Sequence, residues 1–251
     1  KINSAIEKYM KDKNCNIYFS IIPDKNVFIA DKKGVLSLDY DKFRKDMLGR
    51  VDNVNYIDVF DSLSADDYYY TDQHWRQENV IPVAEIISSA MGNEFASSFT
   101  KVDIDTPFYG TYYRQAAIPV KPDKMSYLTN EAIENCIVKR MNDYGNMVNM
   151  GMYVFEKAQG LDPYEMYLGG TQAFITIENP KALSDKELVI FRDSFGSSFA
   201  PLLCENYKKI TLVDFRYIVP DIACSLIDWE STDDVLFMYS TIILNNSTSM
   251  K

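Results

Sequence analysis

The sequence predicts an α/β fold in which helices cover both faces of a mainly parallel sheet. Short β-branched or aromatic runs alternate with longer stretches of helical spacing, as is typical of α/β proteins. The predicted strands are separated by crossovers long enough to hold a helix, which parallel neighbours require. The composition is that of a packed globule, with 47% hydrophobic and 25% charged residues in a chain of 251.

The first hundred residues alternate between helix and strand patterns. We expect helices over residues 2–12, 40–48 and 77–91, and strands over Asn16–Ile22 and Val54–Phe60. In the first of these helices, apolar residues recur at helical spacing. In the third, Pro82 lies early enough for a first turn, and Gly92 is suited to the end of the helix.

Between Thr100 and about Gly170 the pattern changes. Pro, Gly, Tyr and Met become frequent, strand alternation is broken, and no long helix is clear. We interpret this stretch as an insertion of hairpins and loops, in which Cys136–Met141 could pair with Met147–Phe155. Because the sequence holds no internal repeat or low-complexity linker, we expect one domain, residues 1–251, with an insertion over about 100–170.

Regular alternation returns after Gly170. The predicted strands are Phe174–Glu178, Leu188–Arg192, Ile210–Asp214 and Val235–Tyr239, and the predicted helices are Phe195–Tyr207 and Pro220–Trp229. The run Leu188-Val-Ile-Phe191 is continuously apolar, as expected of a strand buried on both faces of a parallel sheet.

Charge and hydropathy argue against nucleic-acid binding and against a membrane-spanning segment in this sequence. The chain has 36 acidic and 26 basic residues and a net charge of −10, so it would repel the phosphates of nucleic acid. No run approaches the ~18 apolar residues of a membrane span. Since the chain starts at Lys1 rather than at a methionine, we expect a processed product, with any signal peptide or anchor upstream.

The cysteine and histidine content argues against a metal centre. Cys15, Cys136, Cys204 and Cys224 are far apart and form no CxxC pair, which disfavours a zinc ribbon or a thioredoxin-like site and leaves the redox compartment open. His74 is the single histidine of the sequence. We therefore expect no metal and no cofactor, and any imidazole chemistry must use His74.

Ser194 stands where open α/β sheets commonly bind ligands. It follows a predicted buried strand and precedes a predicted helix, a position at which free helix N–H groups stabilise negative charge. Acyl transfer requires such stabilisation because its tetrahedral intermediate carries an oxyanion. Gly196 would let a ligand approach the backbone closely. Alternatively, Asp193 or Ser194 simply caps the helix.

Asp72 and His74 form a second candidate pair. In an extended segment, side chains two residues apart point the same way, so the carboxylate could reach one imidazole nitrogen. The other nitrogen would remain free to take a proton, as in a hydrolytic triad. Alternatively, Asp72 is a helix cap and His74 a surface residue beside a packed Trp75. Together with Ser194 as a candidate nucleophile, the pair supplies a candidate base, His74, and a carboxylate, Asp72, that would orient the imidazole.

These segments resemble a known family. Thr71-Asp72-Gln73-His74-Trp75 is similar to the signature of the DHHW family of bacterial SGNH-hydrolase-like proteins, which is akin to the periplasmic alginate O-acetylation proteins. Further similar segments are Phe108–Tyr113, Phe191–Gly196, Pro201–Leu203, Val213–Tyr217 and Val235–Tyr239. The similarity extends from about Ile17 to Tyr239, nearly the whole chain.

The resemblance implies a fold and a set of roles. The fold would be a flavodoxin-like three-layer α/β/α sandwich, with the Asp/His pair before the serine as in a circular permutation of ordinary SGNH hydrolases. Ser194 would be the nucleophile, His74 the base and Asp72 its orienter. Gln73 replaces the first histidine of the family tetrapeptide, and alginate-type relatives carry Thr there. The location would be extracytoplasmic, either secreted or anchored by an upstream segment.

Oxyanion stabilisation has several candidates. The Ser194 backbone N–H is the natural first donor, and Gly170 or the Gln172 amide could supply a second. The favoured alternative is that Gly169 and Gly170 are plain turn residues.

Two arginines and a group of aromatic residues are candidates for substrate contact. Arg192 and Arg216 could meet an acidic substrate, or could pair with aspartates at the sheet end such as Asp193 and Asp214. Rings that suit sugar stacking flank the motifs: Tyr68, Tyr69, Tyr70, Trp75, Tyr109, Tyr112 and Tyr113.

The leading functional hypothesis is carbohydrate O-acyl chemistry through an acyl-Ser194 ester, either as an O-acetyltransferase or as an acetylesterase. The substrate would be a cell-envelope or extracellular polysaccharide, and the family implies a membrane-bound O-acyltransferase as a partner. The alternative is a catalytically silent carbohydrate-binding or scaffold protein. A metal-dependent hydrolase built on Asp72, His74 and Asp193 is disfavoured, because one imidazole and two carboxylates do not match the ligand sets known for zinc sites.

Overall fold

A large mixed sheet organises the protein. The structure is a computed structural model that describes residues 1–95, 98–117, 119–246, 248 and 250. The eight strands lie in the order β2-β1-β10-β8-β9-β7-β5-β6. Their bounds are β1 Asn16–Ile22, β2 Asn55–Tyr56, β5 Ile137–Met141, β6 Met147–Met150, β7 Phe174–Glu178, β8 Glu187–Arg192, β9 Lys209–Val213 and β10 Asp234–Ser240. Neighbours from β2 to β9 run parallel, whereas β7, β5 and β6 are added antiparallel at one edge.

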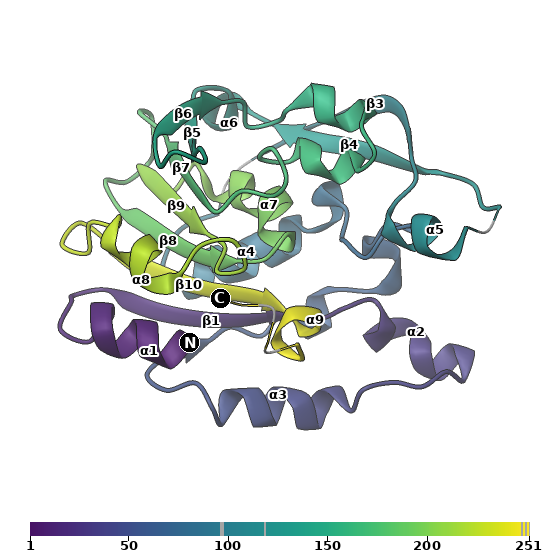
Figure 1. Ribbon diagram of the computed structural model, residues 1–251, viewed down its shortest axis with the longest axis horizontal. Helices are drawn as coiled ribbons and strands as arrows, with labels where there is room; N and C mark the ends of the chain where they lie inside the picture. The colour runs from purple at the N-terminus through teal and green to yellow at the C-terminus, as the bar shows by residue number, and fades with distance from the viewer. Residues whose placement is uncertain (96–97, 118, 247, 249, 251) are drawn as a thin grey trace.

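Helices pack on both faces of this sheet (Figure 1). The α-helices are α1 Ile2–Ala5, α2 Asn26–Lys33, α3 Tyr40–Leu48, α4 Ile81–Ala90, α5 Thr111–Ala116, α6 Glu131–Glu134, α7 Phe195–Phe199, α8 Pro220–Ser225 and α9 Thr241–Leu244. A π-helical segment, η1 Ile6–Met10, follows α1, and short 3₁₀ segments are η2 Phe60–Ser62, η3 Ala65–Asp67, η4 Gln77–Asn79, η5 Phe155–Gln159, η6 Pro163–Met166 and η7 Ala200–Leu203.

Alternating side chains of the central strands divide the core in two. In β8, Leu188 and Ile190 belong to one hydrophobic cluster, which includes residues of α4, α7 and η7. Val189 and Phe191 belong to the other, which includes residues of α1, α3 and α8. Since successive strand residues point to opposite faces, the two clusters are the two faces of one sheet. Both faces are buried, which is why the central strands are continuously apolar.

Residues between 100 and 170 build two separate features. Strands β3 (Thr100–Phe108) and β4 (Asp123–Thr129) form an antiparallel two-stranded sheet, shown in teal at the top of Figure 1. The hairpin β5–β6 pairs as expected, but it also joins the large sheet through β7. The division of the chain into one domain with an insertion stays a prediction.

Several predicted elements are shorter in the structure. The expected strand Val54–Phe60 is reduced to β2, because Asp58 instead accepts a hydrogen bond from the Phe60 N–H and starts a 3₁₀ turn. The expected helix Phe195–Tyr207 is α7 followed by η7, where Pro201 interrupts the α-helical hydrogen bonds. In the described part of the chain, no helix is long and apolar enough to cross a membrane.

Candidate active site

Ser194 lies at the carboxyl end of β8, directly before α7. The cap of this helix comes from Asp193, whose Oδ1 accepts from the Phe195 N–H at 3.0 Å and whose Oδ2 accepts from the Ser240 N–H at 2.8 Å. Asp193 therefore fixes the end of β8 against β10. The Ser194 hydroxyl makes no capping hydrogen bond, and the residue is partly exposed. Of the two capping alternatives, the structure assigns the cap to Asp193.

His74 contacts the Ser194 hydroxyl. The distance from Nε2 of His74 to Oγ of Ser194 is 2.7 Å, although the two residues are 120 positions apart. His74 is only 5% exposed, so its imidazole is held at the site by its surroundings rather than lying free on the surface.

The carboxylate of Asp72 is saturated with donors. Its Oδ1 lies 2.5 Å from Nδ1 of His74 and accepts from the His74 backbone N–H at 2.9 Å. Its Oδ2 accepts from the Thr111 N–H at 2.7 Å and from the Thr111 hydroxyl at 2.6 Å. Burial acts to raise the pKa of Asp72, but the neighbouring His74 and the bonds from Thr111 outweigh it and hold that pKa well below its ordinary value. Asp72 is therefore ionised at neutral pH.

Tyr164 fixes the plane of the imidazole. Its ring stacks on that of His74 with 3.8 Å between centroids and 6° between planes. The Tyr164 hydroxyl lies 2.8 Å from Oγ of Ser198, which also accepts from Nε1 of Trp75 at 2.9 Å. Ser198 belongs to α7, so one serine ties the loop carrying His74 to the helix that follows Ser194.

The backbone of the loop before His74 is held from two sides. Asp123 of β4 accepts from the N–H groups of Tyr70 and Thr71 at 2.9 and 2.7 Å. On the other side, Nζ of Lys25 donates to the carbonyls of Tyr69 and Asp72. Burial lowers the pKa of Lys25 to about 8. These contacts fix Asp72 before any ligand arrives.

Comparison with known proteins supports the resemblance in sequence and extends it to the fold. The sequence pattern of the DHHW protein family matches residues 4–213. The chain belongs to the DHHW family. No curated protein matches the chain significantly.

Solved structures share the fold. A DHHW family protein from Eubacterium siraeum is 19% identical, with a TM-score of 0.73 over 100% of this chain and 84% of that one. PatB1 of Bacillus cereus, solved with a sulfonyl adduct, is 20% identical, with a TM-score of 0.75 over 99% and 88%. The O-acetyltransferase domain of AlgJ from Pseudomonas putida is 10% identical, with a TM-score of 0.52 over 95% and 78%.

In this DHHW protein, the backbone N–H groups expected near an oxyanion are mostly occupied. The Gly196 N–H donates to the Asp193 carbonyl, and the Gly170 N–H donates to the Tyr167 carbonyl. The Gln172 amide donates to the Gly169 carbonyl at 3.1 Å and lines a cavity whose lining does not include Ser194.

Gly196 packs closely against a neighbouring side chain. A Cβ at this position would lie 2.8 Å from Cβ of Arg192, so glycine makes room for that side chain. Gly170 is at φ +73°, and a Cβ there would lie 2.6 Å from the Glu165 side chain, which agrees with the alternative of a turn residue.

The arginines expected to meet an acidic substrate are engaged within the protein. Arg216 binds both carboxylate oxygens of Asp214, with Nε at 2.9 Å from Oδ1 and a terminal nitrogen at 2.7 Å from Oδ2. Arg192 is fully buried, donates to the Asp193 carbonyl and to the Ser197 hydroxyl, and has a terminal nitrogen 3.8 Å from Oδ2 of Asp214. Pairing at the sheet end, the alternative considered for both residues, is what the structure shows.

The aromatic residues around the motifs divide into core and surface. Trp75 is 0% exposed and packs against Phe195 and Phe199, so it is a core residue and cannot stack on a sugar as expected. Tyr68 and Tyr69 are buried as well. A second set of rings remains accessible: Tyr70, Tyr112 and Tyr113 line a cavity of about 220 Å³, and Tyr109 is partly exposed against Tyr113.

Sequence reasoning missed the residues that support Asp72 and His74. Thr111 lies within the segment Phe108–Tyr113 that carried the resemblance, so its position there was the available signal. Tyr164 follows Pro163 in an irregular stretch, where no periodicity marks it. Within the described residues, no group of three or more His, Cys, Asp or Glu side chains is arranged to hold a metal ion.

The backbone of Gly110 packs directly against Asp72, with no space for a side chain. Its φ is an ordinary −80°, but an added Cβ would lie 2.2 Å from Cβ of Asp72. We expect Gly110→Ala to lower the free energy of unfolding by about 1–3 kcal/mol through overpacking. Urea denaturation measures this, with Gly49→Ala as the matched control, because the nearest atom to a Cβ there is 3.4 Å away. Equal stabilities of the two variants would contradict the close approach of Gly110 to Asp72.

Proposed function

We propose that the protein is a serine-dependent acyl-transfer enzyme that acts on O-acyl groups, most simply acetyl groups, of a cell-envelope or extracellular polysaccharide. The observation that carries this proposal is the continuous contact from Asp72 through His74 to the Ser194 hydroxyl. A buried carboxylate, an oriented imidazole and a partly exposed hydroxyl are the groups that nucleophilic acyl transfer requires.

In the proposed mechanism, Nε2 of His74 takes the proton of the Ser194 hydroxyl as Oγ attacks the acyl carbonyl. The tetrahedral intermediate collapses to an acyl-Ser194 ester as His74 gives the proton to the departing oxygen. Water or a sugar hydroxyl then attacks the ester, with His74 again as the base. Asp72 stays ionised, holds the proton on Nδ1 and stabilises the imidazolium formed in each half-reaction.

The Ser194 backbone N–H is the proposed donor to the oxyanion. The next two N–H groups, of Phe195 and Gly196, are already directed to Asp193. Their hydrogen bonds fix the turn in which Ser194 lies, so the Ser194 N–H is presented without reorganisation, which is the condition for effective oxyanion stabilisation.

The finer classification of the fold is part of the proposal. We assign the domain to the SGNH type in permuted order, with a three-layer α/β/α arrangement and residues about 100–170 as the insertion. Asp72 and His74 precede Ser194 in the chain, and helices pack on both sheet faces, which support this assignment.

A similar structure supports the choice of the acetyl group. The AlgJ domain is an O-acetyltransferase, and this chain shares its fold. On this ground we propose an O-acetyltransferase or acetylesterase activity. The extracytoplasmic location and the membrane-bound O-acyltransferase that delivers the acyl group are proposed from membership of the DHHW family.

Labelling with a serine-directed fluorophosphonate tests the proposal. Such a probe phosphonylates a serine that a neighbouring base activates, so mass spectrometry should locate the adduct on Ser194. His74→Ala should suppress labelling while circular dichroism stays native. An unlabelled native protein would contradict the proposal and favour the binding or scaffold alternative.

A further inference from the structure

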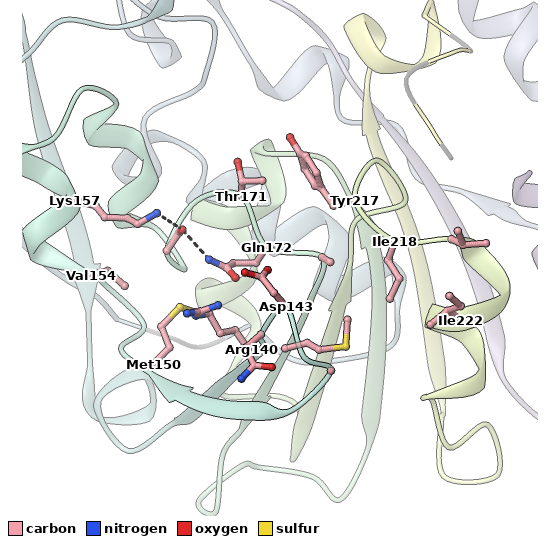
Figure 2. Close-up of a pocket in the computed structure, with 16 residues that line it drawn as sticks. Arg140, Asp143, Met150, Val154, Lys157, Thr171, Gln172, Tyr217, Ile218 and Ile222 are labelled. Carbon is pink, nitrogen blue, oxygen red and sulfur yellow. Dashed lines mark hydrogen bonds between the residues drawn. The ribbon is translucent and has the colours of Figure 1, made fainter.

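A cavity with a volume of about 800 Å³ lies apart from Ser194. Its lining comes from the β5–β6 turn, from the segment before β7 and from the segment after β9. Figure 2 shows Met150 and Lys157 on one side of this cavity and Ile218 and Ile222 on the other, with Arg140 between them in the view. The volume falls within the range typical of small-molecule sites.

The cavity and Ser194 lie at the same end of the strands of the large sheet, the end at which β8 and β9 finish. Ser194 follows β8, Tyr217 of the cavity follows β9, and Ala173 of the cavity precedes the antiparallel strand β7. The order β8-β9-β7 puts β7 two strand spacings, or roughly 10 Å, from β8. A chain of sugars bound across these strand ends would therefore contact both the Ser194 hydroxyl and the cavity.

The polar lining combines donors and acceptors. Within the described residues, the Arg140 guanidinium and the Asp143 carboxylate have no hydrogen-bond or ion-pair partner, although both line the cavity. Lys157 is already neutralised by Glu165 at 2.9 Å. Gln172 adds an amide. The cavity thus presents free hydrogen-bonding groups of both kinds at nearly balanced charge.

An aromatic ring and apolar side chains complete the lining. Tyr217 is 41% exposed, and Ile218 and Ile222 add apolar surface beside it. Sugars combine hydroxyl groups with apolar C–H faces, so paired polar groups beside a ring are complementary to them.

We propose that this cavity binds an uncharged sugar unit of the glycan, roughly 10 to 15 Å from the unit that is acylated or deacylated at Ser194, since β7 lies two strand spacings and the Arg140 strand β5 three strand spacings from β8. The proposal rests on the proposed function and specifies its substrate class. Arg140 donates to sugar hydroxyls, Asp143 accepts from them, and Tyr217 covers a C–H face. A polyanionic glycan fits less well, because the protein carries −10 and Arg216 is already bound to Asp214.

Calorimetric titration with two tetrasaccharides, one of N-acetylglucosamine and one of galacturonate, tests this site. The native protein should bind the neutral probe more tightly than the anionic one. Arg140→Ala and Asp143→Ala should each weaken binding of the neutral probe by about ten- to a hundredfold, the cost of losing hydrogen bonds to a charged group. Asp143 lies in the exposed β5–β6 turn, so its substitution is compatible with folding.

Lys139→Ala is the matched control, since Lys139 is a cation of the same strand that points to the opposite face and does not line the cavity. The proposal is overturned if no neutral probe binds at millimolar concentration, if galacturonate binds more tightly, or if both cavity variants bind like the native protein. Hydrolysis of 4-nitrophenyl acetate by the native protein is measured separately. Its absence alongside cavity binding would refute the acyl chemistry, and the reverse result would refute the sugar site.

Discussion

Ser194→Ala should reduce acyl-ester hydrolysis by roughly 10³- to 10⁶-fold while leaving the fold intact, because no other group of the described residues forms a hydrogen bond with Nε2 of His74. The hydroxyl caps no helix, so its removal breaks none of the hydrogen bonds that hold β8 and α7 together. Stability should therefore change little. Initial rates with 4-nitrophenyl acetate and urea denaturation measure the two effects.

The double variant sharpens this prediction. If Ser194 and His74 act as one unit, Ser194→Ala and His74→Ala should each cost nearly as much as both together. Ser225→Ala is the control serine, since Ser225 is exposed and its hydroxyl bonds only to the Ile222 carbonyl. Turnover that survives in Ser194→Ala at near-native rates would remove Ser194 from the chemistry.

The central strands could be predicted because strands that are buried on both faces consist of successive apolar residues, which are visible in a short stretch of sequence. Phe174–Glu178 is β7 to the residue, and the other three predicted strands after Gly170 agree with β8, β9 and β10 within one residue at each end. Parallel strands covered on both faces must be apolar at successive positions, which short sequence windows reveal. The helix 40–48 is likewise α3, which Asp39 caps through the Lys42 N–H.

Elements held by distant contacts could not be predicted in this way. Strand β3 alternates exposed and half-buried residues and contains Pro107, so its pairing with β4 depends on tertiary structure. The helix α2 has a single buried residue, Ala30, and so presents no apolar face to the sequence. For such elements, long-range packing decides the conformation.

The site shows the same division. Ser194, His74 and Asp72 were expected together because each occurs in a local pattern with chemical meaning, and the structure brings them into contact. The supporting residues Thr111 and Tyr164 come from the stretch between 100 and 170, for which the sequence predicts an insertion of hairpins and loops without any long helix. Their roles depend on contacts with residues that are distant in the sequence, Thr111 with Asp72 and Tyr164 with His74, and such contacts leave no local sequence pattern.

Asp72→Asn should lower turnover on the order of 10³- to 10⁴-fold, the cost of misplacing the imidazole proton in such a triad. The carboxylate receives four hydrogen bonds, two from His74 on Oδ1 and two from Thr111 on Oδ2. An amide has only one acceptor oxygen. If its NH₂ group faces His74, Nδ1 must accept and the proton moves to Nε2, which can then no longer accept the proton of Ser194. If it faces Thr111, it opposes the backbone N–H there.

The pH dependence of stability separates this electrostatic role from simple packing. Because the folded-state pKa of Asp72 lies below its unfolded-state value of 3.8, the carboxylate stabilises the fold above that value. This contribution is lost as the pH falls through 3.8 toward the lower folded-state pKa. Asparagine does not titrate, so the gap in unfolding free energy between the native protein and Asp72→Asn should narrow on acidification. A gap that stays constant down to about pH 2 would contradict the depressed pKa and leave only a packing role for Asp72.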